Sequence, residues 1–121
     1  MTDKVMPDLT GFIGSMTLAH WSVLFKDLIT EGAEYLAEQV GCYWLWDIVG
    51  SYQHKLRDAD FQLWRVEVKD KEAVVTMRED TDLKPRVRQE ISYTDFPEGD
   101  FEFYACRNEA GSVTIMLKSE Y

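Results

Sequence analysis

The spacing of apolar residues changes near residue 58, and this change constrains the fold more than any other feature of the chain. Before it, apolar side chains recur every three or four residues, the period of an amphipathic helix. After it they alternate with polar ones, as in Trp64-Arg65-Val66-Glu67-Val68, the period of a strand with one buried face. We therefore expect residues 1–121 to form a single α+β domain, with residues 1–14 as an extended lead-in.

The helical part is expected over residues 15–57. Thr30 precedes an apolar stripe of helical period and Gly41 follows it, so a helix should begin after Thr30 and end at Gly41. A second helix is predicted from about Tyr43 to Leu56. A third is predicted from Met16 to Ile29, which would give two to three helices in all.

The second predicted helix contains an unusually aromatic stretch, residues 42–53, with two tryptophans, two tyrosines and a single carboxylate, Asp47. So much aromatic surface marks a packing centre, and a buried Asp47 would need a partner such as nearby backbone or a Trp indole. Trp44 and Trp46 should point about 160° apart on a helix. We therefore expect this helix to be sandwiched, one tryptophan meeting the sheet and the other the N-terminal helices or a partner.

Residues 60–121 are expected to form an antiparallel β-meander of about five strands, with the helices packed on its apolar face. Turn-forming residues separate the strands at Asp70-Lys71, at 80–85 and at Asn108-Glu109-Ala110-Gly111. The last strand, Val113 to Leu117, is a candidate for the edge of the sheet.

The net charge is −9, and it is unevenly distributed along the chain. Residues 27–54 contain five acids and no Lys or Arg, and residues 91–121 contain six acids and two bases, whereas residues 55–90 contain nine of each. Such a chain should be repelled by nucleic acid phosphates and by anionic membranes. The acidity accounts for solubility, or else it serves a partner protein with a basic surface.

The first eight residues lack a basic region followed by an apolar block, so no secretory signal is predicted and a cytoplasmic location is expected. In that reducing compartment Cys42 and Cys106 should be free thiols, mostly buried. His20 and His54 are expected to be a structural and a surface histidine, respectively.

Motifs with defined chemistry are absent from the sequence, and we predict no catalytic residue, no metal and no cofactor. The loop Tyr93-Thr94-Asp95-Phe96-Pro97 holds one carboxylate between aromatic residues. Asp95 is expected to cap its own backbone two residues further on, with Pro97 fixing the bend. A small hydrolase using Asp95 with Glu98 or Asp100 is the enzymatic alternative.

Four short motifs resemble, in order, those of a small family known as a domain of unknown function, over residues 9 to 121. The motifs are Thr30-Glu31-Gly32 with Tyr35-Leu36-Ala37, Tyr43-Trp44-Leu45-x-Asp47 with Ser51-Tyr52, Tyr93-Thr94-Asp95-Phe96-Pro97, and Leu117-Lys118-Ser119-Glu120-Tyr121. The chain departs from the family pattern at Lys118, where proline is typical, and at Trp46, where an aliphatic residue is usual. The resemblance implies a setting in bacterial, plasmid and phage genomes, and it transfers no catalytic residue.

This setting favours a small, acidic, non-enzymatic binding protein that inhibits a host nucleic-acid-binding or defence machine, of the anti-CRISPR or anti-restriction type. A homo-oligomeric structural or regulatory domain, such as a homodimer, is the alternative. If Trp46 were exposed beside Glu34 and Glu38, the aromatic stretch would double as a binding surface. The candidate partner-binding residues are Glu31, Glu34, Glu38, Trp46, Asp95, Glu98 and Asp100.

Overall fold

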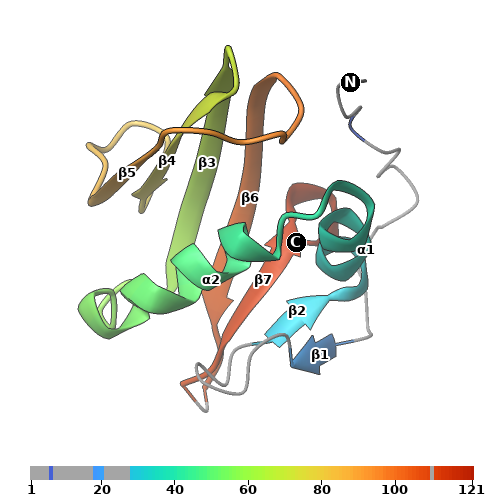
Figure 1. Ribbon diagram of the computed structural model, residues 1–121. Helices are drawn as coiled ribbons and strands as arrows, with labels where there is room; N and C mark the ends of the chain where they lie inside the picture. Colours follow the sequence, from blue (N-terminus) through green and yellow to red (C-terminus); the bar gives the residue numbers. More distant parts are fainter. Residues whose placement is uncertain (1–5, 7–17, 21–27, 110) are drawn as a thin grey trace.

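The structure is a computed structural model that describes residues 6, 18–20, 28–109 and 111–121. Its described residues form an α+β arrangement of two α-helices against a mixed sheet (Figure 1). In chain order the elements are β1 (Leu18–His20), β2 (Leu28–Thr30), α1 (Glu31–Val40), α2 (Tyr43–Tyr52), the 3-10 turn η1 (Gln53–Lys55), β3 (Phe61–Lys69), β4 (Glu72–Arg78), β5 (Val87–Ile91), β6 (Gly99–Arg107), β7 (Val113–Leu117) and the 3-10 turn η2 (Lys118–Glu120).

The strands lie in the order β1-β2-β7-β6-β3-β4-β5. Neighbours are antiparallel except β2 and β7, which run parallel, with Leu28 beside Thr114 and Ile29 beside Ile115. The α+β class and the five strands of residues 60–121 are thus confirmed, but the sheet is mixed and larger than predicted. Val113–Leu117 is not an edge, because β2 and β6 flank it.

The predicted helix from Met16 to Ile29 is wrong in its described parts, which are the strands β1 and β2. The physical reason is tertiary: β2 pairs with β7 and hydrogen-bonds backbone groups that β7 would otherwise leave unpaired. An apolar run of this length fits either a buried strand or a helix, so periodicity could not decide. The extended lead-in predicted for residues 1–14 lies outside the described residues, apart from Met6.

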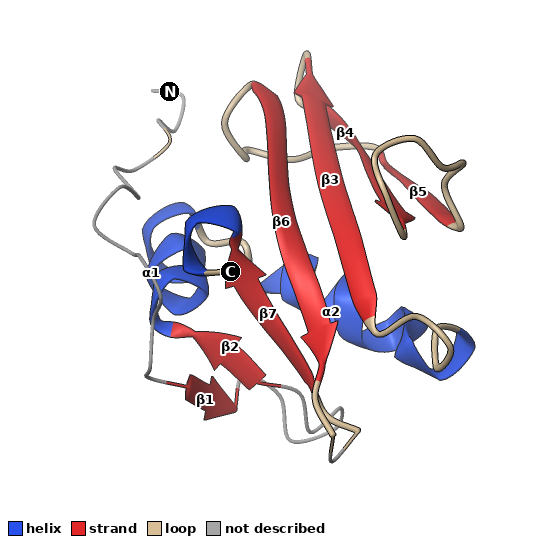
Figure 2. Ribbon diagram, turned by 180° about the vertical axis from the view of Figure 1, so that it is seen from behind, coloured by secondary structure: helices blue, strands red, loops and turns tan. Residues whose placement is uncertain are grey.

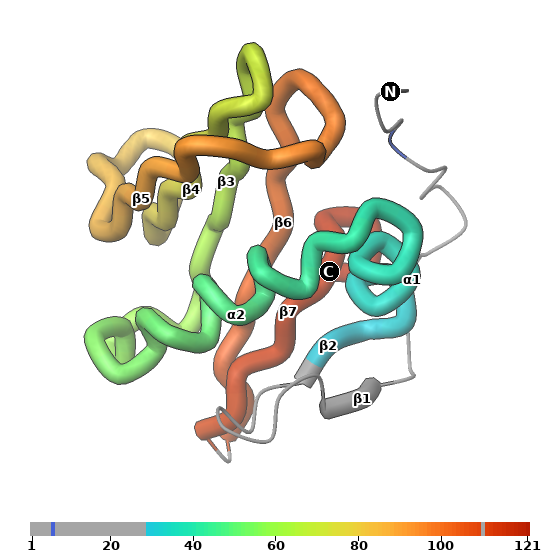
Figure 3. The backbone as a smooth tube through the Cα atoms, in the orientation of Figure 1, coloured from blue at the N-terminus to red at the C-terminus, as the bar shows by residue number. Residues whose placement is uncertain are grey.

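The strands of residues 60–121 are not a simple meander. β3, β4 and β5 follow one another across the sheet, but β6 returns to the free side of β3. The connecting segment 92–98 therefore passes the β3–β4 turn, and Figure 3 shows it crossing in front of these strands. Thr94 N donates to Lys71 O at 2.7 Å, which ties this connection to the turn.

The β3–β4 turn forms at Asp70 and Lys71, as predicted. Both residues have positive φ, 55° and 63°, as a two-residue turn of type I′ requires. The predicted 108–111 hairpin also forms, with Asn108 N donating to Ser112 O and Gly111 at φ 89°.

α1 begins and ends where the sequence predicts. The Thr30 hydroxyl accepts from Ala33 N at 3.2 Å, and Gly41 adopts a left-handed conformation, φ 68° and ψ 40°, after the last turn. The stripe of Ala33, Leu36, Ala37 and Val40 is buried.

α2 crosses one face of the sheet, and the view from behind shows the opposite face without a helix in front of it (Figure 2). Trp46 is fully buried; its ring meets Phe103 of β6 edge-on at 4.9 Å and its indole donates to Ala33 O. Tyr43, Asp47 and Ser51 are exposed, so the helix lies on the sheet and is not sandwiched as predicted. Asp47 therefore needs no buried partner, because water can solvate it.

Candidate functional site

The first and last of the four sequence motifs meet at the N-terminus of α1. Glu120 is buried, and its Oε1 accepts from the Thr30 hydroxyl at 2.5 Å and from Leu117 N at 3.0 Å, while Oε2 accepts from Gly32 N at 3.1 Å. A Cβ at Gly32 would lie 2.7 Å from Glu120 Oε1, so only glycine lets the carboxylate approach. We call these residues the Glu120 latch; its role is structural, since its carboxylate is occupied by donors of the chain.

The other two motifs also meet each other. Trp44, in the first turn of α2, contacts Phe96 of the 92–98 connection with ring centroids 6.5 Å apart and planes at 82°. Phe96 is buried, and its N–H donates to the Thr94 hydroxyl at 3.0 Å. The cap predicted for Asp95 is thus supplied by Thr94, because the residue two positions after Asp95 is Pro97, which has no N–H.

Around the β3–β4 turn the fold gathers a group of exposed carboxylates from segments distant in the sequence. We call this group the acidic hairpin end; it consists of Glu67, Asp70, Glu72, Asp95, Glu98 and Asp100. Five of them line one hollow of about 590 Å³, together with Lys69. The other flanking base is Lys71. The six carboxylates thus outnumber the two lysines that line these hollows.

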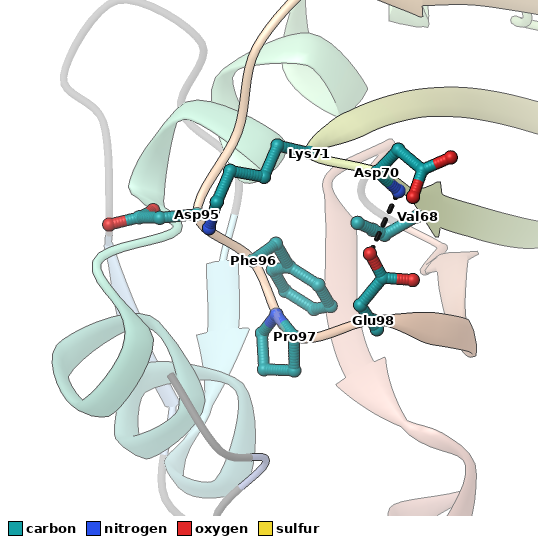
Figure 4. A pocket seen from close by; sticks show the side chains of 7 residues that line it. All are labelled: Val68, Asp70, Lys71, Asp95, Phe96, Pro97 and Glu98. Carbon is teal, nitrogen blue, oxygen red and sulfur yellow. Dashed lines mark hydrogen bonds between the residues drawn. The ribbon is translucent and has the colours of Figure 1, made fainter. Parts of the chain in front are cut away.

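A second hollow, of about 340 Å³, lies between the β3–β4 turn and the 92–98 connection (Figure 4). Glu98 points across it and accepts from Asp70 N at 2.8 Å, whereas the Asp95 side chain points away from Glu98. Phe96 and Pro97 form its apolar wall. Glu98 therefore fixes the turn, and Asp95 faces outward.

Arg65 partly neutralises the acidic hairpin end. Glu67 and Asp100 are directly opposite each other on β3 and β6, an arrangement of like charges that costs stability. The Arg65 guanidinium lies between them, with Nε 3.2 Å from Glu67 and Nη2 hydrogen-bonded to Asp100. This hydrogen bond to Asp100 raises the pKa of Arg65 above its ordinary value, with the charges of Glu67 and Glu102 adding to the effect.

The carboxylates of α1 form a separate group on a different element. Glu31 and Glu38 are exposed and Glu34 is half-buried. Tyr43 lies near two of them: partial burial raises its pKa, and the charges of Glu38 and Glu34 raise it further. Tyr43 keeps 40% of its surface exposed, so it presents an aromatic face beside these carboxylates.

The seven candidate partner-binding residues are thus separated by the fold. Glu31, Glu34 and Glu38 lie on α1, and Asp95, Glu98 and Asp100 lie at the acidic hairpin end. Trp46 is fully buried, so the structure removes it from any contact surface. Glu67, Asp70 and Glu72 were not among the predicted contact residues, because residues 55–90 carry equal numbers of acids and bases. Their position beside a predicted turn was the available signal.

In the hydrolase alternative Asp95 would work with Glu98 or Asp100, but both of these carboxylates already accept hydrogen bonds from the protein. Glu98 accepts from the β3–β4 turn and Asp100 from Arg65. Cys42 is buried, and burial raises the pKa of the half-buried Cys106 thiol, which disfavours the nucleophilic thiolate. Neither cysteine is in a disulfide, and His54 is exposed, as predicted.

Within the described part of the chain, no three His, Cys, Asp or Glu side chains are placed so that they could hold a metal ion together, the carboxylates of the acidic hairpin end included. In the same residues, no helix is both long and apolar enough to cross a membrane.

Fold and site together define a small α+β domain whose distinctive surface is an acidic end of its sheet. The chain belongs to DUF6876, a family of unknown function, whose model matches residues 3–121. The resemblance to a domain of unknown function is thereby confirmed. No curated protein and no solved structure matches the chain.

Proposed function

We propose that this protein is a non-enzymatic binding protein that uses the acidic hairpin end to engage a host protein with a basic surface. The observation that carries the proposal is the convergence of six exposed carboxylates from β3, β4, β6 and the turn and connection between them. These segments are separated in sequence, so the local acidity results from the fold and not from a run of acidic residues.

The cost of this arrangement supports a binding role. Glu67 and Asp100 face each other directly across two strands, which disfavours folding unless a cation intervenes. A polar pair without charge would satisfy the same positions at lower cost. Solubility does not require the carboxylates to be opposed, because the same acids could be dispersed over the surface.

The partner that fits is a protein with a groove made for nucleic acid. Clustered carboxylates can occupy the positions of phosphates and accelerate encounter by long-range attraction. Tyr93, which is 61% exposed and next to the acidic hairpin end in sequence, offers an aromatic anchor for the contact.

An inhibitor of a host defence or nucleic-acid-processing machine, of the anti-CRISPR or anti-restriction type, is the most concrete form of this function. It agrees with the phage and plasmid setting that the family resemblance implies, and it places the protein in the cytoplasm. A short chain can block such a machine stoichiometrically, because covering the nucleic-acid groove needs no catalysis.

The test is capture of a nucleic-acid-binding protein from host lysate by the full chain and by charge-reversed variants. We expect E67K/E72K to lose capture, and D82K/E109K, which changes the net charge equally at exposed sites elsewhere, to retain it. The variant E31K/E38K tests separately whether the carboxylates of α1 contribute to capture. Capture should also fail at about 0.5 M salt, because the Debye length is then roughly 4 Å and charges further apart are largely screened.

Two outcomes would contradict the proposal. Capture that is lost equally in E67K/E72K and D82K/E109K would show that net charge alone matters. Capture that survives in E67K/E72K and in high salt would remove the acidic hairpin end from the interaction. Circular dichroism of each variant checks that the fold is retained.

A further inference from the structure

β5 forms one edge of the sheet, and it has the features of a strand that accepts a partner strand. It pairs with β4 on one side, and no described strand lies on its other side. The opposite edge, β1, has three residues, whereas β5 has five. An edge strand leaves part of its backbone N–H and C=O groups available for pairing.

The side chains of β5 alternate in a way that matches a second copy of itself. Arg88 and Glu90 are exposed on the face away from α2, and they form an ion pair at 2.8 Å. Val87 is buried and Ile91 half-buried on the other face. In an antiparallel pairing centred on Gln89, Arg88 lies opposite Glu90 of the copy, and Val87 lies opposite Ile91.

Neighbouring registers lack this complementarity. Side chains keep to their faces only when the register shifts by two residues. Centring the pair on residue 88 places Arg88 opposite Arg88, and centring it on residue 90 places Glu90 opposite Glu90, both of which are repulsive. The charges of β5 therefore select one register.

Exposed apolar residues lie at both ends of this edge. The described chain has four large exposed hydrophobic residues, and two of them flank β5: Leu83, 50% exposed, and Tyr93, 61% exposed. Leu83 lies four residues before β5 and Tyr93 two residues after it. An antiparallel pair therefore brings the end of one copy that carries Tyr93 to the end of the other that carries Leu83, where both can add apolar contact.

We propose that two copies of this chain associate through antiparallel pairing of β5, with a two-fold axis at Gln89, to form one continuous sheet. The proposal rests on the backbone and charges of β5 and not on the carboxylates of the acidic hairpin end. The pairing closes on itself, because both copies contribute the same edge. The contact is short, and interfaces below about 1,200 Å² are weak, so dimerisation should depend on concentration in the micromolar range.

The charges allow a test in which repelling variants rescue one another. R88E places its new carboxylate opposite Glu90 of the copy, and E90R places its new guanidinium opposite Arg88 of the copy. We expect each single variant to sediment as a monomer at concentrations where the wild type dimerises. An equimolar mixture should dimerise, because the two carboxylates on this face of the R88E chain then lie opposite the two guanidinium groups of the E90R chain.

Sedimentation velocity gives the oligomeric state of the wild type, of each single variant and of their mixture. The double variant R88E/E90R, the swap, should dimerise like the wild type. A wild type that remains monomeric at several hundred micromolar would overturn the proposal, and so would single variants that dimerise unchanged. A mixture that stays monomeric while both chains keep their circular dichroism spectra would overturn it as well. If a single variant unfolds, the comparison of wild type with the swap decides: a monomeric, folded swap refutes the register.

Discussion

At the residue scale, Glu120 illustrates how a carboxylate can be buried without a cation. It accepts hydrogen bonds from one hydroxyl and two backbone N–H groups, and it lies at the N-terminus of α1. The dipole of the helix favours negative charge at this end. One contact therefore joins the two sequence motifs that contain Thr30 and Glu120, residues 90 positions apart.

We predict that Glu120→Ala lowers the free energy of unfolding by roughly 3 kcal/mol, because it leaves buried donors without an acceptor. Glu120→Gln should also destabilise, since its amide N–H would face a donor. The control is Glu38→Ala, an exposed glutamate of α1, which should change the stability by less than about 0.5 kcal/mol. Urea unfolding of the three variants measures the difference; equal effects would disprove the latch.

The second prediction at this scale concerns pH. Burial raises the pKa of the Cys106 thiol above its ordinary 9.0. As the pH rises past 9.0, the unfolded chain loses this proton before the folded chain does, so alkali favours unfolding. The contribution is present at lower pH and is lost as the thiol titrates.

We therefore expect the stability of the wild type to fall more steeply between about pH 8 and 10 than that of Cys106→Ala. Tyr43, whose pKa is raised by partial burial and by Glu38 and Glu34, contributes the same sign in both proteins and cancels in the difference. Urea midpoints across this range are the measurement. Parallel pH profiles would contradict the prediction.

At the scale of elements, the connection 92–98 is held by α2 on one side and by the β3–β4 turn on the other. Trp44 contacts Phe96, and Phe96 also lies 6.0 Å from the ring of Phe101. Thr94 N and Glu98 tie the connection to the turn. The positions of Asp95 and Glu98 in the acidic hairpin end therefore depend on both α2 and the turn.

A double-mutant cycle tests this coupling. Phe96→Ala should cost roughly 3 kcal/mol, because it removes a buried ring. Trp44→Ala should cost less, since Trp44 is half-buried. We expect the pair to be coupled by about 0.5–1.5 kcal/mol, the range for edge-to-face rings. Strict additivity in chemical denaturation would show that α2 and the connection are energetically independent.

The elements also show what the sequence could predict. Both ends of α1 followed from Thr30 and Gly41, and the five later strands from their alternation, because these signals are local. The strands β1 and β2 could not be predicted, since their apolar run becomes extended only through pairing with β7. The return of β6 to β3 is likewise non-local, as turn residues specify a bend but not which strand lies beyond it.

The candidate site was predictable in part. Asp95, Glu98 and Asp100 were expected to take part in binding. In the structure Glu98 lines both hollows of the acidic hairpin end, whereas Asp95 lines one and Asp100 the other. Glu72 was hidden by the balanced charge of its segment, as were the other carboxylates of β3 and the turn. Trp46 was considered as a contact residue but is buried. The orientation of α2 on the sheet decides which tryptophan is covered, and this orientation could not be predicted from the sequence.

At the scale of the whole molecule, the charge of −9 acts on folding as self-repulsion, and the opposed Glu67 and Asp100 contribute to it at the acidic hairpin end. Arg65 is the cation that offsets it between Glu67 and Asp100. Added salt should therefore stabilise the protein, since screening weakens the repulsion more than it weakens a close ion pair.

We predict that Arg65→Met lowers the stability by about 1 kcal/mol and makes it rise more steeply with salt between about 0.02 and 0.5 M. Arg88→Met is the matched control, because the Arg88–Glu90 pair is more exposed. Thermal unfolding at low protein concentration gives both the stability of each variant and its dependence on salt. A salt dependence that is the same in both variants would argue against repulsion between Glu67 and Asp100.

The Glu120 latch also bears on how the chain folds during its synthesis. Thr30 leaves the ribosome long before Glu120, and β2 leaves it long before β7, its parallel neighbour. The N-terminus of α1 must therefore remain without its acceptor until Glu120, 90 residues later in the chain, has left the ribosome. This domain should therefore fold as one unit once β7 and Glu120 are available, and not progressively along the nascent chain.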